Sequence, residues 1–260
     1  MDHTPPLSKE KRKLIRSLAS RKIRRRKGLC VLEGPRVIEE ARRAGLLEFT
    51  VLHPRAAMER AFSGEIEDSL EGPVFSAAGE FFGEITDVEQ SQGALGVARI
   101  PLPLDLVGFA PGGERSVLLL LDAVQDPGNV GGLIRSAWSL GVSGVLLGPG
   151  TADPFGQKAV RASAGGVFHL PWYPDFGVEG ASALTAKGFT IYIAQAGGRS
   201  HREAEFSPRA ILAVGNEARG FSDWLLDVGE PVGVPMAGDA DSLNVVVAGS
   251  IILEAMMERN

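Results

Sequence analysis

The chain of 260 residues contains one cysteine and four histidines, and this shortage excludes several kinds of site. A single cysteine, Cys30, cannot form a disulfide within the chain or build a cysteine-based zinc site. The histidines are scattered, without the paired spacing of a metal-binding helix, at His3, His53, His169 and His201. We therefore expect a protein that holds no metal and works in a reducing, cytoplasmic setting.

Long hydrophobic runs and the common nucleotide motifs are also absent. The longest apolar run, residues 245–253, is too short to cross a bilayer, which takes about 20 residues. Charge follows residues 1–6, so no signal peptide and no membrane partner are expected. The sequence contains no Walker A motif, no G-x-G-x-x-G loop and no G-x-S-x-G elbow. These absences argue against an ordinary doubly wound nucleotide enzyme.

One segment departs from the acidic average of the chain. The net charge is −5, but residues 9–27 contain eleven Lys or Arg against one acid, Glu10, and so carry +10. The remainder therefore carries −15. A charge run is usually a solvated helix face, but so dense a group of cations on an acidic chain favours a contact with nucleic acid at one place.

The order of apolar and helical segments predicts two α/β domains. Residues 1–100 are expected to form a small domain after a loose tail at residues 1–8, and residues 101–116, rich in Pro and Gly, a linker. Residues 117–260 are expected to form a larger domain. Its short apolar strands alternate with helices, which is typical of a parallel sheet covered on both faces.

The expected elements are as follows. In the first domain, helices are predicted at residues 9–27, 35–44, 55–62 and 77–85, and strands at 29–33, 49–52, 74–75 and 94–98. In the second domain, strands are predicted at residues 117–121, 145–147, 168–170, 190–194, 211–214 and 232–234, and helices at 130–140, 157–163, 178–186, 222–225 and 245–257.

Three polar loops follow apolar strands of the second domain, where ligands bind in open α/β sheets. The first, residues 122–137, places Asn129 near the start of a helix, where it is either an N-cap or a site residue. Arg135 lies on that helix between apolar neighbours, so it is either a solvated helix charge or, as we expect, a partly buried side chain with an anionic partner.

The second and third loops carry glycine and further polar side chains. Gly215 and Gly220 let backbone approach a ligand closely, and Glu217 between them suits a hydroxyl or a cation; the alternative is a plain polar turn. In the third loop, Ser242 and Asn244 stand at the mouth of the apolar final helix. They are either helix caps or part of a ligand site.

In this order the segments resemble the three motifs of the SpoU/TrmH family of RNA 2′-O-ribose methyltransferases, of the SPOUT superfamily. They read DPGNVGGLIRSA, GNEARGF and VPMAGDADSLNVVVAGSIILE, and VRASAGGVFHLP (residues 160–171) resembles the family's segment between the first two. The resemblance covers residues 117–257. Residues 21–36 and Gln92-Gly93 carry a weaker likeness to the family's accessory RNA-binding domain, of the L7Ae/L30e type.

The resemblance implies an α/β trefoil-knot domain that binds S-adenosylmethionine in the knotted crevice, preceded by a smaller α/β RNA-binding domain. General rules of chain connection predict instead an unknotted sheet. The resemblance also implies a homodimer with active sites at the subunit interface. The apolar final helix suits such an interface and equally the core of a monomer.

The motif match also implies roles for individual residues. The catalytic positions are Asn129, Arg135, Glu217, Ser242 and Asn244. The cofactor contacts are Ala213, Gly215, Gly220, Val234, Met236 and Leu243. The RNA-binding positions are Arg21, Lys22, Arg24, Arg25, Arg26, Lys27 and Arg36. Because a guanidinium is a poor base, we assign Arg135 to the target phosphate and the forming alkoxide rather than to proton abstraction.

Three functions stay open at this point. The first is S-adenosylmethionine-dependent 2′-O-methylation of RNA, most often ribosomal RNA and alternatively transfer RNA. The second is a catalytically silent RNA-binding or ribosome-assembly protein; the presence of all five catalytic positions argues against it. The third, an unrelated nucleotide enzyme, is opposed by the missing phosphate-loop motifs.

Overall fold

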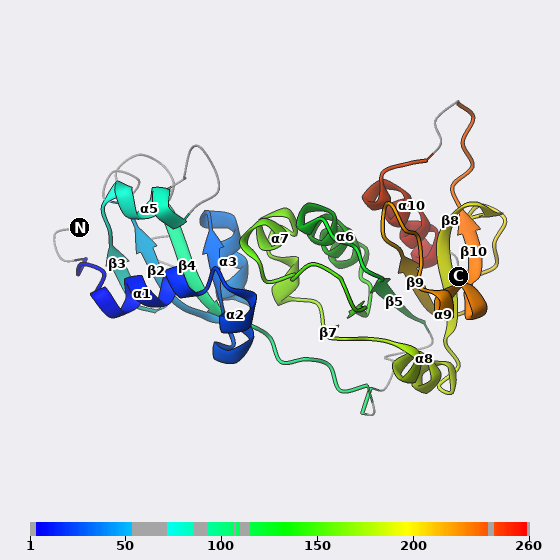
Figure 1. Ribbon diagram of the computed structural model, residues 1–260, viewed down its shortest axis with the longest axis horizontal. Helices are drawn as coiled ribbons and strands as arrows, with labels where there is room; N and C mark the ends of the chain where they lie inside the picture. Colours follow the sequence, from blue (N-terminus) through cyan, green and yellow to red (C-terminus); the bar gives the residue numbers. More distant parts are fainter. Residues whose placement is uncertain are drawn as a thin grey trace. The chain divides into compact units, whose positions relative to one another are not determined.

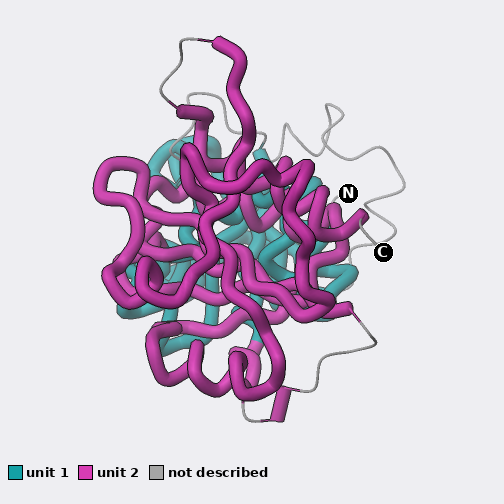
Figure 2. The backbone as a smooth tube through the Cα atoms, turned by 90° about the vertical axis from the view of Figure 1, so that its right-hand side faces the viewer, with its two compact units in different colours: residues 1–101, 153–169 teal, residues 102–152, 170–260 magenta. Residues whose placement is uncertain are grey.

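The computed structural model describes residues 4–53, 72–85, 93–106, 108–109, 115–238 and 242–258. The helix expected at residues 55–62, residues 107 and 110–114 of the expected linker and residues 239–241 of the third loop lie outside these ranges. The chain divides into two compact units (Figure 2). Unit 1 comprises Met1–Pro101 with Asp153–His169, and unit 2 comprises Leu102–Ala152 with Leu170–Asn260.

Unit 1 is built on a four-stranded mixed sheet (Figure 1). Its strands, in the order β1-β4-β2-β3, are β1 (Leu29–Glu33), β4 (Ala94–Arg99), β2 (Leu47–Leu52) and β3 (Val74–Ser76). β4 is antiparallel to both neighbours, and β2 and β3 are parallel. Its helices are α1 (Lys9–Ser17), α2 (Arg21–Lys27), α3 (Pro35–Arg43), α5 (Gly79–Ile85) and α7 (Gln157–Ala162), with a 3₁₀ turn η1 (Gly166–Phe168).

The two faces of this sheet are covered by different helices. Alternate residues such as Leu95 and Val97 of β4 join one buried cluster with α1 and α5. Gly96, between them, faces the other way, and a Cβ there would meet Ile38 of α3 at 3.1 Å. A glycine at this position therefore lets α3 pack closely on the sheet.

The basic segment forms two helices, so the single helix predicted at residues 9–27 is wrong. α1 ends because Leu18 turns into the core, where it is 1% exposed, and Ser20 starts α2. The loose tail is also wrong for its described part. Pro6 pairs with Ser76, and Leu7 is buried, so these residues extend the edge of the sheet beside β3.

Unit 2 contains a six-stranded sheet in which every pairing is parallel, which confirms the predicted parallel sheet. The order is β10 (Glu230–Gly233), β8 (Thr190–Ser200), β9 (Arg209–Val214), β5 (Ser116–Leu121), β6 (Gly144–Leu147) and β7 (Trp172–Tyr173). Its helices are α6 (Pro127–Leu140), α8 (Val178–Thr185), α9 (Asp223–Val228) and α10 (Val245–Glu258).

Both faces of the central strands are buried, as an apolar strand such as β5 predicts. Leu118 and Leu120 point into a cluster completed by Leu184 of α8 and Leu225 of α9. α6 and α10 pack together, and a Cβ at Gly249 of α10 would meet Leu133 and Val214. The final helix is therefore packed against the sheet of its own chain over part of its surface.

Two further expectations differ from the structure. The strand predicted at residues 168–170 is wrong: Gly165, with φ +92°, starts the turn η1, and Phe168 bonds back to it. β8 runs to Ser200, six residues beyond the predicted end, where Gly198 packs against the backbone of β10. The knot implied by the family resemblance stays a prediction.

The segment that forms α7 and η1 belongs by contact to unit 1, where α7 packs on β1. No helix of the described residues is long and apolar enough to span a bilayer. Among all the residues that the structure describes, no three His, Cys, Asp or Glu side chains lie close enough together to hold a metal ion.

Candidate active site

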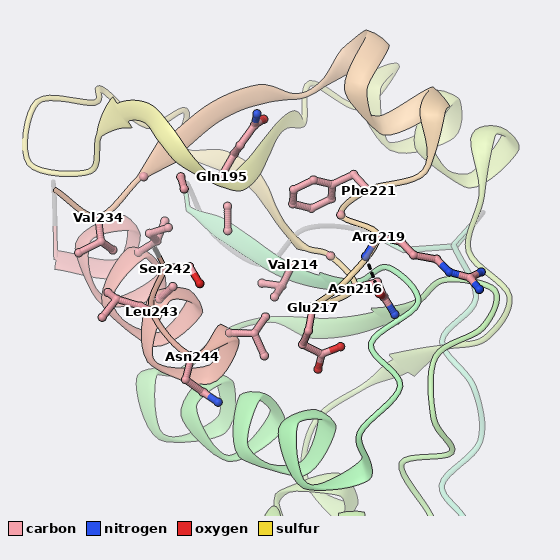
Figure 3. A pocket seen from close by; sticks show the side chains of 18 of the residues that line it. Gln195, Val214, Asn216, Glu217, Arg219, Phe221, Val234, Ser242, Leu243 and Asn244 are labelled. Atoms are coloured by element: carbon pink, nitrogen blue, oxygen red, sulfur yellow. Dashed lines mark hydrogen bonds between the residues drawn. The ribbon is translucent and has the colours of Figure 1, made fainter. Parts of the chain in front are cut away.

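A cavity of about 640 Å³ opens in unit 2 where β9 and β10 end, beside residues 194–196 of β8 (Figure 3). It brings the second and third sequence loops together at the start of α10, as ligand sites in open α/β sheets predict. It is lined by Ala194, Gln195, Ala196, Val214, Gly215, Asn216, Glu217, Arg219, Gly220, Phe221, Leu226, Gly233, Val234, Met236, Ser242, Leu243, Asn244, Val245, Ala248 and Ile252.

The loop after β9 is held in shape by Asn216, a residue that the sequence reasoning did not single out. Asn216 and Gly220 exchange backbone hydrogen bonds of 2.9 and 3.0 Å. The Asn216 side chain accepts from the N–H groups of Ala218 and Arg219 and donates to the Ala123 carbonyl at 2.9 Å. Its burial, 8% exposed, fits this role. The signal in the sequence that could have pointed to Asn216 is its place beside Glu217 in a loop bounded by Gly215 and Gly220.

Glycine at position 215 is required by this loop. A Cβ there would lie 2.7 Å from the Gly220 carbonyl oxygen and 3.0 Å from Phe221. The backbone of residues 215–220 therefore doubles back tightly and presents main-chain atoms to the cavity.

Asp122 is a second residue that the sequence reasoning missed. It follows β5, is 1% exposed, and accepts from the Ser222 N–H at 2.7 Å and the Ser222 hydroxyl at 2.9 Å. A buried carboxylate with two donors fixes the position of its partner. Asp122 thereby anchors the end of the loop that carries Phe221.

Asn129 and Glu217, from the first and second loops, are in direct contact. The Asn129 side-chain amide donates to Glu217 Oε1 at 2.7 Å. The N-cap of α6 is Asp126, which accepts from the Asn129 N–H, so the capping alternative for Asn129 is wrong. Because Asp126 caps the helix, the side-chain amide of Asn129 is available to bind the carboxylate of Glu217 at the cavity.

Asn244 is both a cap and a cavity residue. Its Oδ1 accepts from the Val246 N–H at 2.9 Å, and its carbonyl accepts from Ala248 at the first turn of α10. Figure 3 shows Asn244 and Glu217 on the side of the cavity nearest the α6 ribbon, while the Arg219 side chain points away. The cap thus fixes the backbone, and the remaining amide nitrogen belongs to the cavity edge.

The other predicted cofactor positions divide between the wall and the layer beneath it. Gly215, Gly220, Val234, Met236 and Leu243 all line the cavity, as does Ser242. Ala213 is fully buried in β9 and lies outside the lining. Its small side chain supports the strand under the loop.

Two predicted catalytic residues, Asn129 and Arg135, lie outside the cavity lining, and of these Asn129 is hydrogen-bonded to Glu217 in the lining whereas Arg135 is not. The Arg135 side chain is exposed on α6 and makes no hydrogen bond or ion pair with the described residues. The expectation of a partly buried arginine with an anionic partner is therefore wrong. The helix turns this position outward although both sequence neighbours, Ile134 and Ser136, are covered at least in part.

Comparison with known proteins agrees with this arrangement. The SpoU rRNA Methylase family matches residues 116–254, and an MRM3-like substrate binding domain matches residues 9–96. The 23S rRNA (guanosine(2553)-2′-O)-methyltransferase of Bacillus subtilis (strain 168) is 32% identical over 241 residues, 92% of each chain.

This chain belongs to the SpoU rRNA methylase family.

Two further proteins extend the comparison. The 23S rRNA (uridine(2479)-2′-O)-methyltransferase of Streptomyces viridochromogenes is 34% identical over 174 residues, 63% of this chain and 60% of that one. A crystal structure of an AdoMet-bound rRNA methyltransferase from Sinorhizobium meliloti has a TM-score of 0.80 at 28% identity, covering 97% of this chain and 96% of that one. The likeness to the SpoU fold therefore includes both units.

In this SpoU family member three of the cations of α1 are engaged within the protein, while Lys9 and Lys13 are exposed. Lys11 lies over the rings of Phe49 and Phe75, at 4.8 and 5.0 Å from their centroids. Arg12 and Arg16 lie over Phe81, and Arg16 also pairs with an acid of α5. Such contacts are typical of cation–π packing. The first basic helix is thus attached to the sheet by its charged side chains.

The cations of α2 have a different environment. Arg21, Lys22, Arg25, Arg26 and Lys27 are exposed, as is Arg36 on α3. Arg24 is only 8% exposed and is committed to Asp153 and to the carbonyls of Leu18 and Ala19. The assignment of Arg24 to RNA is therefore corrected: its guanidinium has no donor pair left for a phosphate.

Three side-chain contacts in unit 1, the first two of them ion pairs, attach described residues of the 153–169 segment to the N-terminal part of the chain. They are Arg24–Asp153 at 2.5 Å, Arg161–Glu33 at 2.8 Å and His169–Glu40 at 3.0 Å. A Cβ on Gly165 would also meet Glu40 at 2.5 Å, so this approach depends on glycine. Nearby, burial raises the pKa of Cys30 to about 12, which makes its thiol a poor nucleophile.

Proposed function

We propose that this protein transfers the methyl group of S-adenosylmethionine to a ribose 2′-hydroxyl of ribosomal RNA. Its family, the names of its relatives in Bacillus subtilis and Streptomyces viridochromogenes, and the AdoMet-bound structure from Sinorhizobium meliloti all support this proposal. The observation that carries it is the meeting of the second and third sequence loops at one cavity, with Asn129 of the first loop bonded to Glu217 in its lining.

The cavity fits S-adenosylmethionine. Its volume of about 640 Å³ lies within the range of small-molecule sites, roughly 300–1,000 Å³. Gly215 and Gly220 expose main-chain atoms to the cavity, and the side chains of Val234, Met236 and Leu243 form an apolar part of its wall. When bound, the cofactor supplies an electrophilic methyl group on a sulfonium. These five residues would hold it, largely through main-chain atoms.

The polar residues at the edge of the cavity are suited to orient a ribose. Ser242 offers a hydroxyl, and Asn244 offers an amide nitrogen whose direction is set because Oδ1 caps α10. Asn129 fixes the carboxylate of Glu217. Positioning of this kind supplies much of the rate gain in a transfer that needs no covalent intermediate, by analogy with effective molarities of roughly 10⁵ M or more.

Arg135 supports a dimeric enzyme. It is expected to bind the target phosphate and stabilise the alkoxide, but its own chain leaves it outside the cavity lining. We propose that it serves the cavity of a second copy across an interface that includes α6 and α10. Val247 of α10, 46% exposed, gives that interface an apolar contact.

The division of labour follows the sequence boundaries. Residues 1–100 are proposed to bind RNA through the exposed cations of α2, and residues 117–260 to carry the chemistry in a knotted fold, with residues 101–116 as the link. Ribosomal rather than transfer RNA is favoured by the printed substrates of the relatives.

Two measurements test the function. Calorimetry should show stoichiometric binding of S-adenosylmethionine, and labelled methyl should appear in total RNA at a mappable ribose of ribosomal RNA. Absence of cofactor binding would refute the proposal. Binding without transfer to any RNA would support a silent RNA-binding protein, and label in transfer RNA alone would correct the substrate.

A further inference from the structure

Glu217 is the sole carboxylate among the described residues that line the cavity. The one other ionisable side chain in that lining is Arg219, which Figure 3 shows pointing away. Ser242, Asn216, Asn244 and Gln195 are neutral donors and acceptors, no more basic than a ribose hydroxyl. Among the described residues of this wall, Glu217 is therefore the side chain suited to act as a base.

The contact with Asn129 leaves one oxygen of this carboxylate available. Asn129 Nδ2 donates to Oε1 at 2.7 Å, and Oε2 accepts no hydrogen bond from the described residues. Because Asn129 belongs to a helix whose N-cap, Asp126, is itself formed, the amide is held in one direction. The pair thus presents a single oriented acceptor at the cavity edge.

We propose that Glu217 accepts the proton of the target 2′-hydroxyl, with Asn129 as its positioning residue. This inference rests on the proposed methyltransferase function. The hydroxyl oxygen forms its bond to the sulfonium methyl, the carbon–sulfur bond breaks, and its electron pair returns to sulfur, leaving a neutral thioether. The hydroxyl proton passes to Oε2, so the carboxylate becomes a carboxylic acid and charge balances.

The role of Arg135 is complementary to that of Glu217. A guanidinium stays protonated in proteins, so it suits the phosphate and the developing oxyanion rather than the proton. A carboxylate is an ordinary general base. Two oppositely charged groups then act on one hydroxyl, one by removing its proton and one by stabilising its oxygen.

The decisive variant is Glu217→Gln, which keeps the shape of the side chain and an acceptor for Asn129 but removes the base. We expect single-turnover methyl transfer to fall about 10²- to 10⁴-fold. Affinity for S-adenosylmethionine by calorimetry, and for the RNA substrate by filter binding, should stay within about threefold of the parent. Glu179→Gln, an exposed acid on α8 outside the cavity, is the matched control and should keep full activity.

A pH profile separates proton acceptance from mere positioning. The parent rate should fall toward acid as the carboxylate becomes protonated, and Glu217→Gln should lose that acid limb. Asn129→Ala should lower the rate but keep the limb. The other charged groups on adjoining elements are Asp126, the N-cap of α6, Arg135 on α6 and Arg219 in the same loop as Glu217. Asp126→Asn keeps an oxygen that can cap the helix, so it tests whether the carboxylate of Asp126, rather than that of Glu217, causes the acid limb.

The outcomes separate this inference from the function on which it rests. A parent protein that binds no S-adenosylmethionine, or methylates no RNA, defeats the proposed function. An active parent whose Glu217→Gln variant keeps full turnover, or keeps the acid limb, overturns the inference alone. Loss of cofactor affinity in Glu217→Gln overturns it too, because Glu217 then binds the cofactor instead of the proton.

Discussion

Arg24 of α2 grips one oxygen of Asp153, through Nε at 2.9 Å and Nη2 at 2.5 Å. Its remaining nitrogen donates to the carbonyls of Leu18 and Ala19 at the end of α1. One guanidinium thus joins both basic helices to the segment that precedes α7. Arg24 therefore belongs by sequence to the basic run expected to bind RNA, but its guanidinium holds elements of unit 1 together.

Replacing Arg24 should therefore cost stability. Arg24→Ala leaves the carboxylate of Asp153, whose side chain is only 13% exposed, without its cationic partner, and loss of one member of a buried pair typically lowers the free energy of unfolding by about 3 kcal/mol. Chemical denaturation followed by circular dichroism measures the change. Arg25→Ala, at the exposed neighbouring position, should stay within about 0.5 kcal/mol. Equal effects in the two variants would contradict a structural role for Arg24.

The fold could be predicted where local pattern and burial agree. Apolar strands such as β5 and β9 and the body of helix α6 follow from the apolar pattern of the sequence itself, although α6 begins at Pro127, three residues before the predicted start, and is capped by Asp126. The break between α1 and α2 could not be predicted from charge, because it is set by Leu18 entering a core formed by distant strands. The same holds for β8, whose extension depends on pairing with β10.

The site was predictable to the extent that its residues carry motifs. Glu217, Ser242 and Asn244 lie at one cavity because strand ends meet there. The supporting contacts of Asp122 and Asn216 are long-range, at sequence separations of about a hundred residues, so no local pattern reveals them. The orientation of Arg135 was mispredicted because apolar sequence neighbours do not fix which way a helical side chain points.

Salt dependence should separate the two basic helices. Removing a phosphate contact lowers the slope of log affinity against log salt by about 0.7 to 0.9. Arg25→Ala and Arg26→Ala, on exposed positions of α2, should each weaken RNA binding and lower that slope. Lys11→Ala, whose ammonium lies over Phe49, should leave the slope unchanged. A slope that is the same in all three variants and the parent would show that α2 makes no phosphate contact.

Glycine at position 215 should be essential for cofactor binding. In Gly215→Ala the new Cβ meets the Gly220 carbonyl at 2.7 Å, so the loop must open and its backbone leaves the cavity wall. We expect affinity for S-adenosylmethionine to fall at least tenfold by calorimetry. Gly238→Ala, where a Cβ meets nothing within 4 Å, is the control and should bind as the parent does. Unchanged affinity in Gly215→Ala would place the cofactor elsewhere.

Arg135→Ala should lower turnover by orders of magnitude, about 10²-fold or more for a lost oxyanion contact. The side chain is exposed, so unfolding should change by no more than about 0.5 kcal/mol, as for the control Ser139→Ala on the same helix. Full activity in Arg135→Ala would remove the residue from the mechanism.

Mixing two inactive proteins tests whether Arg135 acts across a dimer. If Arg135 of each subunit serves the cavity of the other, a heterodimer of Arg135→Ala and Glu217→Gln has one cavity that carries both changes and one that carries neither. Random co-refolding makes half of all dimers mixed, so about a quarter of the parent activity should return. If Arg135 served its own chain's cavity, every site would carry one lesion and the mixture would stay inactive. Recovery of methyl transfer on mixing therefore demonstrates both the dimer and the residue that each subunit lends to the other.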